Sequence, residues 1–258
     1  MKISIITATF NSEKNISRAL NSLKNQRYKN YQSIVIDGKS SDSTLAIIKL
    51  LEIPNMTILS EPDCGIYDAL NKGIRLSQGE IIGVLHSDDY FIDDFVLQDV
   101  CNIFERDSDI DAVIGNVEYF AKHNSKKVTR FYKSNKFKKW MFRFGFMPAH
   151  TATFIKKDRL NSLNGYDIFF KSASDFDLLL RLFQLSDLKY KNLNRVIVRM
   201  SEGGTSSSGW ESIKRTTKEI HKSLKKNNIY SNILFLSIRI PAKFFSQKIL
   251  NFLPRKKI

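Results

Sequence analysis

The sequence predicts an α/β fold: a mixed, mainly parallel sheet flanked by helices, with a basic helical extension at its C-terminal end. Short β-branched runs alternate with helix-patterned segments through the first 90 residues, as expected when each parallel strand is followed by a crossover helix. Strand-like runs then follow one another without long helices between them, which predicts some antiparallel pairing. Beyond residue 209 the sequence becomes lysine-rich and keeps a helical pattern, which predicts the extension.

Apolar β-branched runs predict the strands, and apolar residues at helical spacing predict the helices. The predicted strands are 2–9, 33–37, 56–59, 80–85, 112–120, 128–132, 152–155 and 189–199. Among the helices, the segment 65–76 carries Ile66, Leu70 and Ile74 at i, i+4 and i+8, which is one stripe of a helix. The predicted helices are 14–25, 44–51, 65–76, 93–106, 175–185, 213–226, 229–240 and 242–253.

These elements divide the chain into a domain at residues 1–209 and a basic amphipathic helical tail at 210–258. No run reaches the roughly 18 uncharged apolar residues that a membrane-spanning helix needs. The first residues lack the separate regions of a signal peptide. Cys64 and Cys101 have no metal-ligand spacing and suit a reducing compartment. We therefore expect a cytosolic protein, or one bound to a cytosolic surface.

The net charge of +15 is concentrated in two segments. Residues 122–143 hold nine Lys or Arg and no acid, and residues 210–258 hold twelve with two acids, so the rest of the chain is mildly acidic. Such a distribution favours docking on an anionic partner, whereas the plainer interpretation is a pair of solvated basic faces.

Polar residues follow the ends of the first four predicted strands. They are Thr9, Asn11, Asp37, Glu61, Asp63, Asp88 and Asp89. Ligands on parallel sheets bind beyond the carboxyl ends of the strands, and several acids at one edge repel each other unless a cation lies among them. A divalent cation with oxygen ligands is the simplest candidate. Any one of these residues alone would more often be a turn or cap residue.

Other site motifs fail on spacing. The stretch Gly38-Lys39-Ser40 resembles the end of a P-loop, but the first glycine of that motif would fall at Ser33, inside a strand. No G-x-G-x-x-G follows the first strand, which argues against a dinucleotide cofactor. The four histidines have no zinc spacing, and an EF-hand pattern at 107–118 has Ala112 in place of the required glycine.

Four motifs in order carry a resemblance to a known family: IITATFN at 5–11, VIDGKSSDST at 35–44, SEPDCGIYDALNKG at 60–73 and LHSDD at 85–89. The set resembles the inverting family-2 glycosyltransferases of the GT-A fold, especially bacterial enzymes of surface-polysaccharide synthesis such as lipopolysaccharide or capsule. The resemblance covers about residues 1–205. It implies a nucleotide-sugar half at about 1–106 and an acceptor half at about 107–209.

The resemblance also implies roles for the strand-end residues. Asp37 would hold the nucleotide base, and Thr9 and Asn11 would line the nucleotide pocket. Asp88 would contact the ribose side, and Asp89 would bind Mn²⁺ or Mg²⁺ on the diphosphate. Three further residues, Asp63, Asp68 and Lys72, lie in the segment that closes over the donor. Lys72 would touch phosphate, or would simply face solvent.

The base that takes the acceptor proton would be Asp175, in ASDFDL at 173–178. The sequence departs from the family in having Ser174 where Glu is frequent, and His86 where Asn is common. His150 matches a family histidine near the acceptor or the phosphates. Asp177 is two residues further along the helix and should point elsewhere. The plainer interpretation of Asp175 is an acid that favours the first turn of its helix.

Together these features predict a metal-dependent inverting glycosyltransferase that takes a UDP- or GDP-linked sugar to a glycan acceptor, lipid-linked by family analogy, with no nucleic-acid partner. Apolar stripes bordered by lysine in 210–258 suit an anionic membrane surface, which places the protein on the cytoplasmic face of the inner membrane. The alternative for this tail is packing on the domain or on a second subunit. The alternatives for the whole are a non-catalytic polyanion-binding protein and a polyprenyl-phosphate glycosyl synthase.

Overall fold

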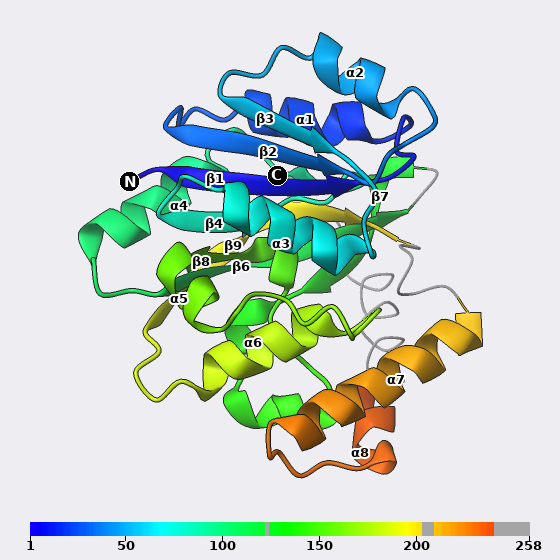
Figure 1. The fold of residues 1–258 in the computed structure, drawn as a ribbon. Coiled ribbons are helices and arrows are strands. Elements are labelled where there is room, and N and C mark those ends of the chain that lie inside the picture. Colours follow the sequence, from blue (N-terminus) through cyan, green and yellow to red (C-terminus); the bar gives the residue numbers. More distant parts are fainter. Residues whose placement is uncertain (122–123, 203–208, 240–258) are drawn as a thin grey trace.

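The computed structural model describes residues 1–121, 124–202 and 209–239. Its centre is a nine-stranded sheet in the order β3-β2-β1-β4-β8-β6-β9-β5, with β7 paired to β6 (Figure 1). The strands are β1 (Ile3–Thr9), β2 (Tyr31–Asp37), β3 (Met56–Ser60), β4 (Ile81–Val84), β5 (Tyr90–Phe91), β6 (Ala112–Ala121), β7 (Asn124–Tyr132), β8 (Thr153–Lys156) and β9 (Tyr190–Ser201). The α/β class predicted from the sequence is confirmed.

The first four strands of the order pair in parallel, and helices cover both of their faces. Successive residues of a strand point to opposite faces, so Ile5 belongs to one core cluster and Ile6 to the other. The cluster with Ile5 packs against α1 (Ile16–Lys24), α2 (Thr44–Leu50) and α4 (Val96–Arg106). The cluster with Ile6 packs against α3 (Ile66–Leu76) and α6 (Ser174–Gln184).

The second half of the sheet is mixed, as predicted. Strand β8 runs antiparallel to both β4 and β6, whereas β9 is parallel to β6. Several short elements escaped the sequence patterns: β5, α5 (Lys157–Ser162) and three 3-10 helices at Ser134–Lys136, Lys139–Phe144 and His150–Ala152. None of them spans two full turns of an α-helix, so no apolar period can develop in them.

The described part of the tail packs against the domain. Helix α7 (Gly209–Lys226) and the short α8 (Ile233–Ser237) bury Ile220, Leu224 and Leu236 in the same cluster as α3 and α6. Figure 1 shows α7 beside α6 and α8 beside α7, at the opposite end of the molecule from α2. No helix within the described residues is both long enough and apolar enough to cross a membrane. The boundary at residue 209 stays a prediction.

The single helix predicted at 229–240 is wrong in its bounds. Asn228 has a positive φ of 57° and ends α7, and the chain then runs without helix up to Asn232. The Asn232 side chain accepts a hydrogen bond from the backbone N–H of Phe235 at 2.9 Å, which begins α8. Two asparagines in special backbone roles therefore delay the start of the helix to Ile233. The helix predicted at 242–253 lies outside the described residues.

Candidate active site

The polar strand ends meet at one edge of the sheet, as predicted. Thr9 is the parallel register partner of Asp37, and Asp37 is the partner of Ser60. Two backbone hydrogen bonds continue the ladder past the strands, from the Gly38 N–H to the Thr9 carbonyl (2.9 Å) and from the Glu61 N–H to the Asp37 carbonyl (3.0 Å). The arrowheads of β1, β2 and β3 lie on the same side of the molecule in Figure 1. This edge is where α/β sheets bind ligands.

Asp37 is fully buried and organises the loop that follows β2. Its carboxylate accepts hydrogen bonds from the Ser40 N–H (3.0 Å), the Ser40 hydroxyl (2.5 Å) and the Ser60 hydroxyl (2.6 Å). Asn11 meets the same loop: its backbone has a φ of 45°, and its side-chain oxygen accepts from the Ser41 N–H at 2.9 Å. The structure therefore joins Asn11 and Asp37 in one pre-formed wall, with Asp37 as its anchor.

The segment after β3 folds back over this wall. Gly38 allows the approach, because a Cβ atom there would lie 2.8 Å from Asp63 Oδ2. Lys72 has three partners within the segment: Glu61 Oε1 at 2.9 Å, Asp68 Oδ2 at 3.3 Å and the Pro62 carbonyl at 3.0 Å. The hydrogen bond to Glu61 raises the pKa of the Lys72 ammonium. In this structure Lys72 thus clamps the segment to α3, rather than facing an open site or free solvent.

In the acidic pair after β4, the Asp89 carboxylate is buried and one of its oxygens has no described hydrogen-bond donor. Asp89 is 2% exposed; its Oδ1 accepts from the Ser201 N–H at 3.3 Å, and its Oδ2 is buried with no hydrogen-bond partner among the described residues. Burial, and next the neighbouring charge of Asp88, raise the pKa of Asp89 well above its usual value. Arg18 holds the loop by donating to the Asp88 carbonyl at 2.9 Å.

Asp89 fits a metal ligand on this ground, since a cation would balance an otherwise costly buried charge. In the described parts of the chain, no group of three or more His, Cys, Asp or Glu side chains is placed to hold a metal ion.

A chain of side chains leads from the acidic loop to Asp175. The Ser87 hydroxyl lies 3.0 Å from that of Ser12, which ties the loop to the turn after β1. His86 Nε2 lies 2.9 Å from His150 Nε2, and His150 Nδ1 lies 3.3 Å from Asp175 Oδ2. Burial, and next the proximity of His150, lower the pKa of His86 to about 3, so His86 is neutral. The structure therefore brings His150 and Asp175 together.

Asp175 is held from its other side as well. Its Oδ1 accepts from the Tyr67 hydroxyl at 3.1 Å and from the Phe176 N–H at 2.9 Å. Burial, and then the Asp175 charge, raise the pKa of Tyr67 well above its usual value, so the phenol stays a donor. Tyr67 stacks on Tyr166, with ring centroids 5.6 Å apart. Both Tyr166 and Asp175 line a small cavity of about 20 Å³, with room for one water.

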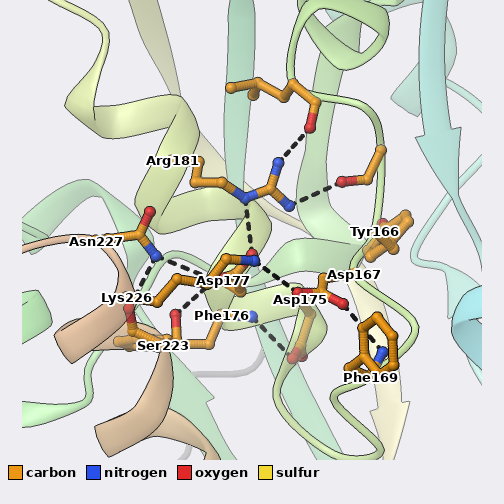
Figure 2. Close-up of polar contacts among 12 residues, drawn as sticks. Tyr166, Asp167, Phe169, Asp175, Phe176, Asp177, Arg181, Ser223, Lys226 and Asn227 are labelled. Carbon is orange, nitrogen blue, oxygen red and sulfur yellow. Dashed lines mark hydrogen bonds and ion pairs between the residues drawn. The ribbon is translucent and has the colours of Figure 1, made fainter.

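Asp177 points elsewhere, as expected for a residue about 200° further around the helix. Figure 2 shows its contacts: Arg181 Nε at 2.7 Å, the Ser223 hydroxyl at 2.8 Å and Asn227 Nδ2 at 3.1 Å. Arg181 is an α6 residue, and the other two lie in and just after α7. Asp177 is fully buried and joins these two helices, so Asp175 alone of the pair faces the site.

Sequence reasoning missed Tyr67 and Arg18, and left His86 out of the site. The apolar stripe predicted for α3 began one residue too early. Ile66 is 42% exposed, whereas Tyr67, Leu70 and Ile74 are buried. Counting Tyr67 as apolar would have found the correct face, because 67, 70 and 74 also follow helical spacing. Arg18 lies on the polar side of its helix pattern, and nothing in the sequence singles it out.

Comparisons with known proteins identify the family of this chain. The model of Glycosyl transferase family 2 matches residues 4–166. An uncharacterized glycosyltransferase of Mycobacterium tuberculosis is 30% identical over 181 residues, which are 69% of this chain and 68% of that protein. A relative from Methanococcus voltae is 28% identical over 254 residues, covering 91% of this chain and 77% of its own. It is named dolichyl N-acetyl-alpha-D-glucosaminyl phosphate 3-beta-D-2,3-diacetamido-2,3-dideoxy-beta-D-glucuronosyltransferase.

Solved structures show the same fold. S. aureus TarS 1-349 in complex with UDP-GlcNAc has a TM-score of 0.68 at 19% identity, covering 98% of this chain and 75% of that one. The mannosyltransferase PcManGT from Pyrobaculum calidifontis, in complex with GDP-Man and Mn²⁺, has a TM-score of 0.63 at 17% identity, covering 87% and 63%. In a further TarS crystal structure the match spans 40% of that chain. The fold is GT-A, and the chain belongs to glycosyl transferase family 2 and is a glycosyltransferase.

Proposed function

We propose that the protein transfers a sugar from a nucleoside diphosphate sugar to an acceptor hydroxyl, with inversion, and that Asp175 is the base. The position of Asp175 carries the proposal. Its Oδ1 has two donors, Tyr67 and Phe176, whereas the one described partner of Oδ2 is His150. A carboxylate oxygen accepts at two lone pairs, so Oδ2 keeps one for an incoming hydroxyl.

The reaction is a single displacement. The acceptor O–H bond breaks and its proton goes to Asp175 Oδ2, while the acceptor oxygen bonds to the anomeric carbon of the donor. The bond from that carbon to the diphosphate oxygen breaks, and its electron pair leaves with the nucleoside diphosphate. The loop anchored by Asp37 and the turn at Asn11 would form the nucleotide wall. We place Asp88 beside the ribose and Asp63 and Asp68 in the segment that covers the donor.

Asp89 is the residue that would hold Mn²⁺ or Mg²⁺. When bound, the metal would neutralise charge that develops on the departing diphosphate. The support is the buried Oδ2 without a donor. The solved neighbours carry UDP-GlcNAc in one case and GDP-Man with Mn²⁺ in the other, so we propose a UDP- or GDP-linked donor.

We further propose that the acceptor is a lipid-linked glycan and that the protein works on the cytoplasmic face of the inner membrane, in surface-polysaccharide synthesis. The name of the Methanococcus relative includes a dolichyl phosphate-linked acceptor. In this chain, the two basic segments meet. The Phe144 and Phe235 rings stack at 5.1 Å, and the Ser231 hydroxyl donates to the Arg143 carbonyl at 2.6 Å.

The surface around this contact, which we call the basic aromatic face, combines the 3-10 helix Lys139–Phe144 with α8. Large apolar side chains stand out from it: Trp140 is 61% exposed, Ile233 68% and Leu234 78%. Lys138, Lys139 and Arg143 are exposed beside them. Exposed apolar side chains can enter the headgroup region of a bilayer, and the cations beside them are attracted to anionic lipids. This face is therefore our candidate for membrane contact.

The test of the transfer proposal is turnover of the Asp175→Asn variant. Release of nucleoside diphosphate from UDP- and GDP-sugars would be measured with Mn²⁺ and a membrane-lipid extract as acceptor. We expect kcat to fall by about 100-fold or more, because general base catalysis contributes 10²–10⁴-fold. Binding of the nucleoside diphosphate should be retained, since Asp175 does not touch the nucleotide wall. A variant with wild-type kcat would contradict the assignment.

A further inference from the structure

The imidazole rings of His86 and His150 contact each other through their Nε2 atoms, and His150 also contacts the proposed base Asp175. His86, in the loop after β4, is partly buried, and its Nε2 lies 2.9 Å from His150 Nε2. The other nitrogen of His150 lies 3.3 Å from Asp175 Oδ2. The other nitrogen of His86, Nδ1, is buried without a hydrogen-bond partner among the described residues. These four nitrogens allow few arrangements of protons.

The carboxylate fixes the first proton. An ionised Asp175 only accepts hydrogen bonds. His150 Nδ1 lies 3.3 Å from Asp175 Oδ2, and without a hydrogen it would direct a lone pair at the negative carboxylate, which is repulsive. His150 Nδ1 therefore carries a hydrogen. In a neutral imidazole the second nitrogen is then an acceptor, so His150 Nε2 must receive the contact from His86. His86 is accordingly the donor, through its Nε2–H.

The buried nitrogen of His86 agrees with this direction. As the Nε2–H tautomer, His86 leaves only a lone pair at its buried Nδ1. The opposite arrangement, with His150 donating to His86, would place an N–H at that same Nδ1, where no described acceptor meets it. A buried donor without a partner costs the whole of its lost hydration, so the first arrangement is favoured.

We propose that His86 is a positioning residue, which holds His150 as the Nδ1–H tautomer and so fixes the orientation of Asp175 Oδ2 toward the acceptor hydroxyl. The inference rests on the proposed function, in which Asp175 is the base. Oδ1 is bound by Tyr67 and Phe176, so the carboxylate plane is set by those two groups and by His150. The present 3.3 Å is long for such a hydrogen bond, and catalytic contacts of this kind tighten when substrate is bound.

The test compares two substitutions of similar size. His86→Gln keeps an N–H at about the reach of Nε2, and His86→Leu removes it. We expect His86→Gln to keep kcat within about threefold of wild type. His86→Leu should lower kcat by about 10- to 100-fold with an unchanged KM for the donor sugar, because a small misplacement of a reacting group has effects of this size.

A double variant separates this inference from the proposed function. In an Asp175→Asn background, His86→Leu should have no further effect on kcat, because it acts through that carboxylate. If Asp175→Asn is itself fully active, the proposed function fails. If Asp175→Asn is inactive but His86→Leu has wild-type kcat, the role of His86 fails alone.

The tautomer can be read directly in the spectrum of the wild-type protein. The chain has four histidines, so ¹⁵N-histidine labelling gives a simple long-range ¹H–¹⁵N spectrum, in which His86→Gln and His150→Gln assign the two residues. We expect the Nε2–H pattern for His86 and the Nδ1–H pattern for His150. The Nε2–H pattern for His150 would overturn the proposal.

Discussion

At the residue scale, the site depends on a few buried polar groups whose partners are incomplete. Asp89 Oδ2 and His86 Nδ1 are both buried and without described partners, whereas Asp37 has three donors. Buried polar atoms are normally satisfied, so the exceptions point to places where a ligand or a mechanism completes the site. The sequence pattern predicted Asp37 and Asp89 as strand-end acids, and the family resemblance assigned them to the nucleotide base and to the metal. The structure adds that Asp37 anchors its own loop, whereas Asp89 Oδ2 has no described donor.

The lowered pKa of His86 in the folded protein predicts a pH dependence of stability. The pKa of His86 is about 3 in the folded protein, against 6.5 for an ordinary histidine. Below pH 6.5 the unfolded chain therefore binds a proton that the folded chain does not, and stability falls as the pH drops from 6.5 toward 3. Between pH 7 and pH 5 this amounts to about 2 kcal/mol.

Urea unfolding at both pH values checks this, with His86→Gln as the comparison. The raised pKa of Asp89 acts with the opposite sign, because its folded form takes up a proton more readily as the pH falls. Subtracting the His86→Gln curve removes this and other shared contributions. If the pH 7 to pH 5 loss is the same in both proteins, His86 is not buried in a neutral state.

At the element scale, the long strands and helices follow from sequence period, and the short elements do not. Strands β1 to β4 and helices α1 to α4 were all predicted within a few residues of their ends. Strand β5 has only two residues and forms because it pairs with β9. Such pairing is set by tertiary contact, which a local pattern cannot contain. For the same reason, nothing in 209–226 predicted that Ser223 would meet Asp177.

The Asp177 junction predicts a strong effect on stability. Replacing Asp177 with Ala would leave Arg181 without its carboxylate partner and would remove the hydrogen bonds from Ser223 and Asn227 to α6 at this position. Removing one partner of a buried ion pair costs about 3–5 kcal/mol, and we expect that loss in the free energy of unfolding. The control is Asp175→Asn, which leaves the junction intact. Equal urea midpoints for the two variants would contradict this role.

At the scale of the whole molecule, parts of the two basic segments meet on one face. Segments about 90 residues apart in the sequence share the basic aromatic face, and this meeting was not predictable, because the sequence offered only two separate basic runs. The described part of the tail also packs its apolar residues on the domain, which was the alternative interpretation for it. Packing on the domain and an exposed basic aromatic face are compatible, because α7 and α8 bury one side of each helix and expose the other.

The basic aromatic face predicts binding to anionic vesicles. We expect the double variant Lys138→Glu/Lys139→Glu to bind phosphatidylglycerol-containing vesicles at least about 30-fold more weakly, because each Lys near such a surface contributes about 1 kcal/mol. The matched control is Lys29→Glu/Lys49→Glu, with the same charge change at exposed sites away from this face. Flotation with anionic and neutral vesicles measures both. Equal weakening in the two variants would mean that only net charge matters, and a stable dimer through the face would point to a second copy.

The central claim is a nucleoside diphosphate site completed by a metal ion at Asp89, and its most direct test is a thermal-shift panel of UDP and GDP with and without Mn²⁺. At about 100 times the Kd, a ligand stabilises by about 2.7 kcal/mol, or about 5–10 °C for a domain of this size. We predict such a shift for one nucleotide in the presence of Mn²⁺, and its loss in Asp89→Asn. That variant should be no less stable without ligand, because the buried Oδ2 has no described partner to lose. No shift with either nucleotide, or a Mn²⁺-dependent shift that survives Asp89→Asn, would contradict the account.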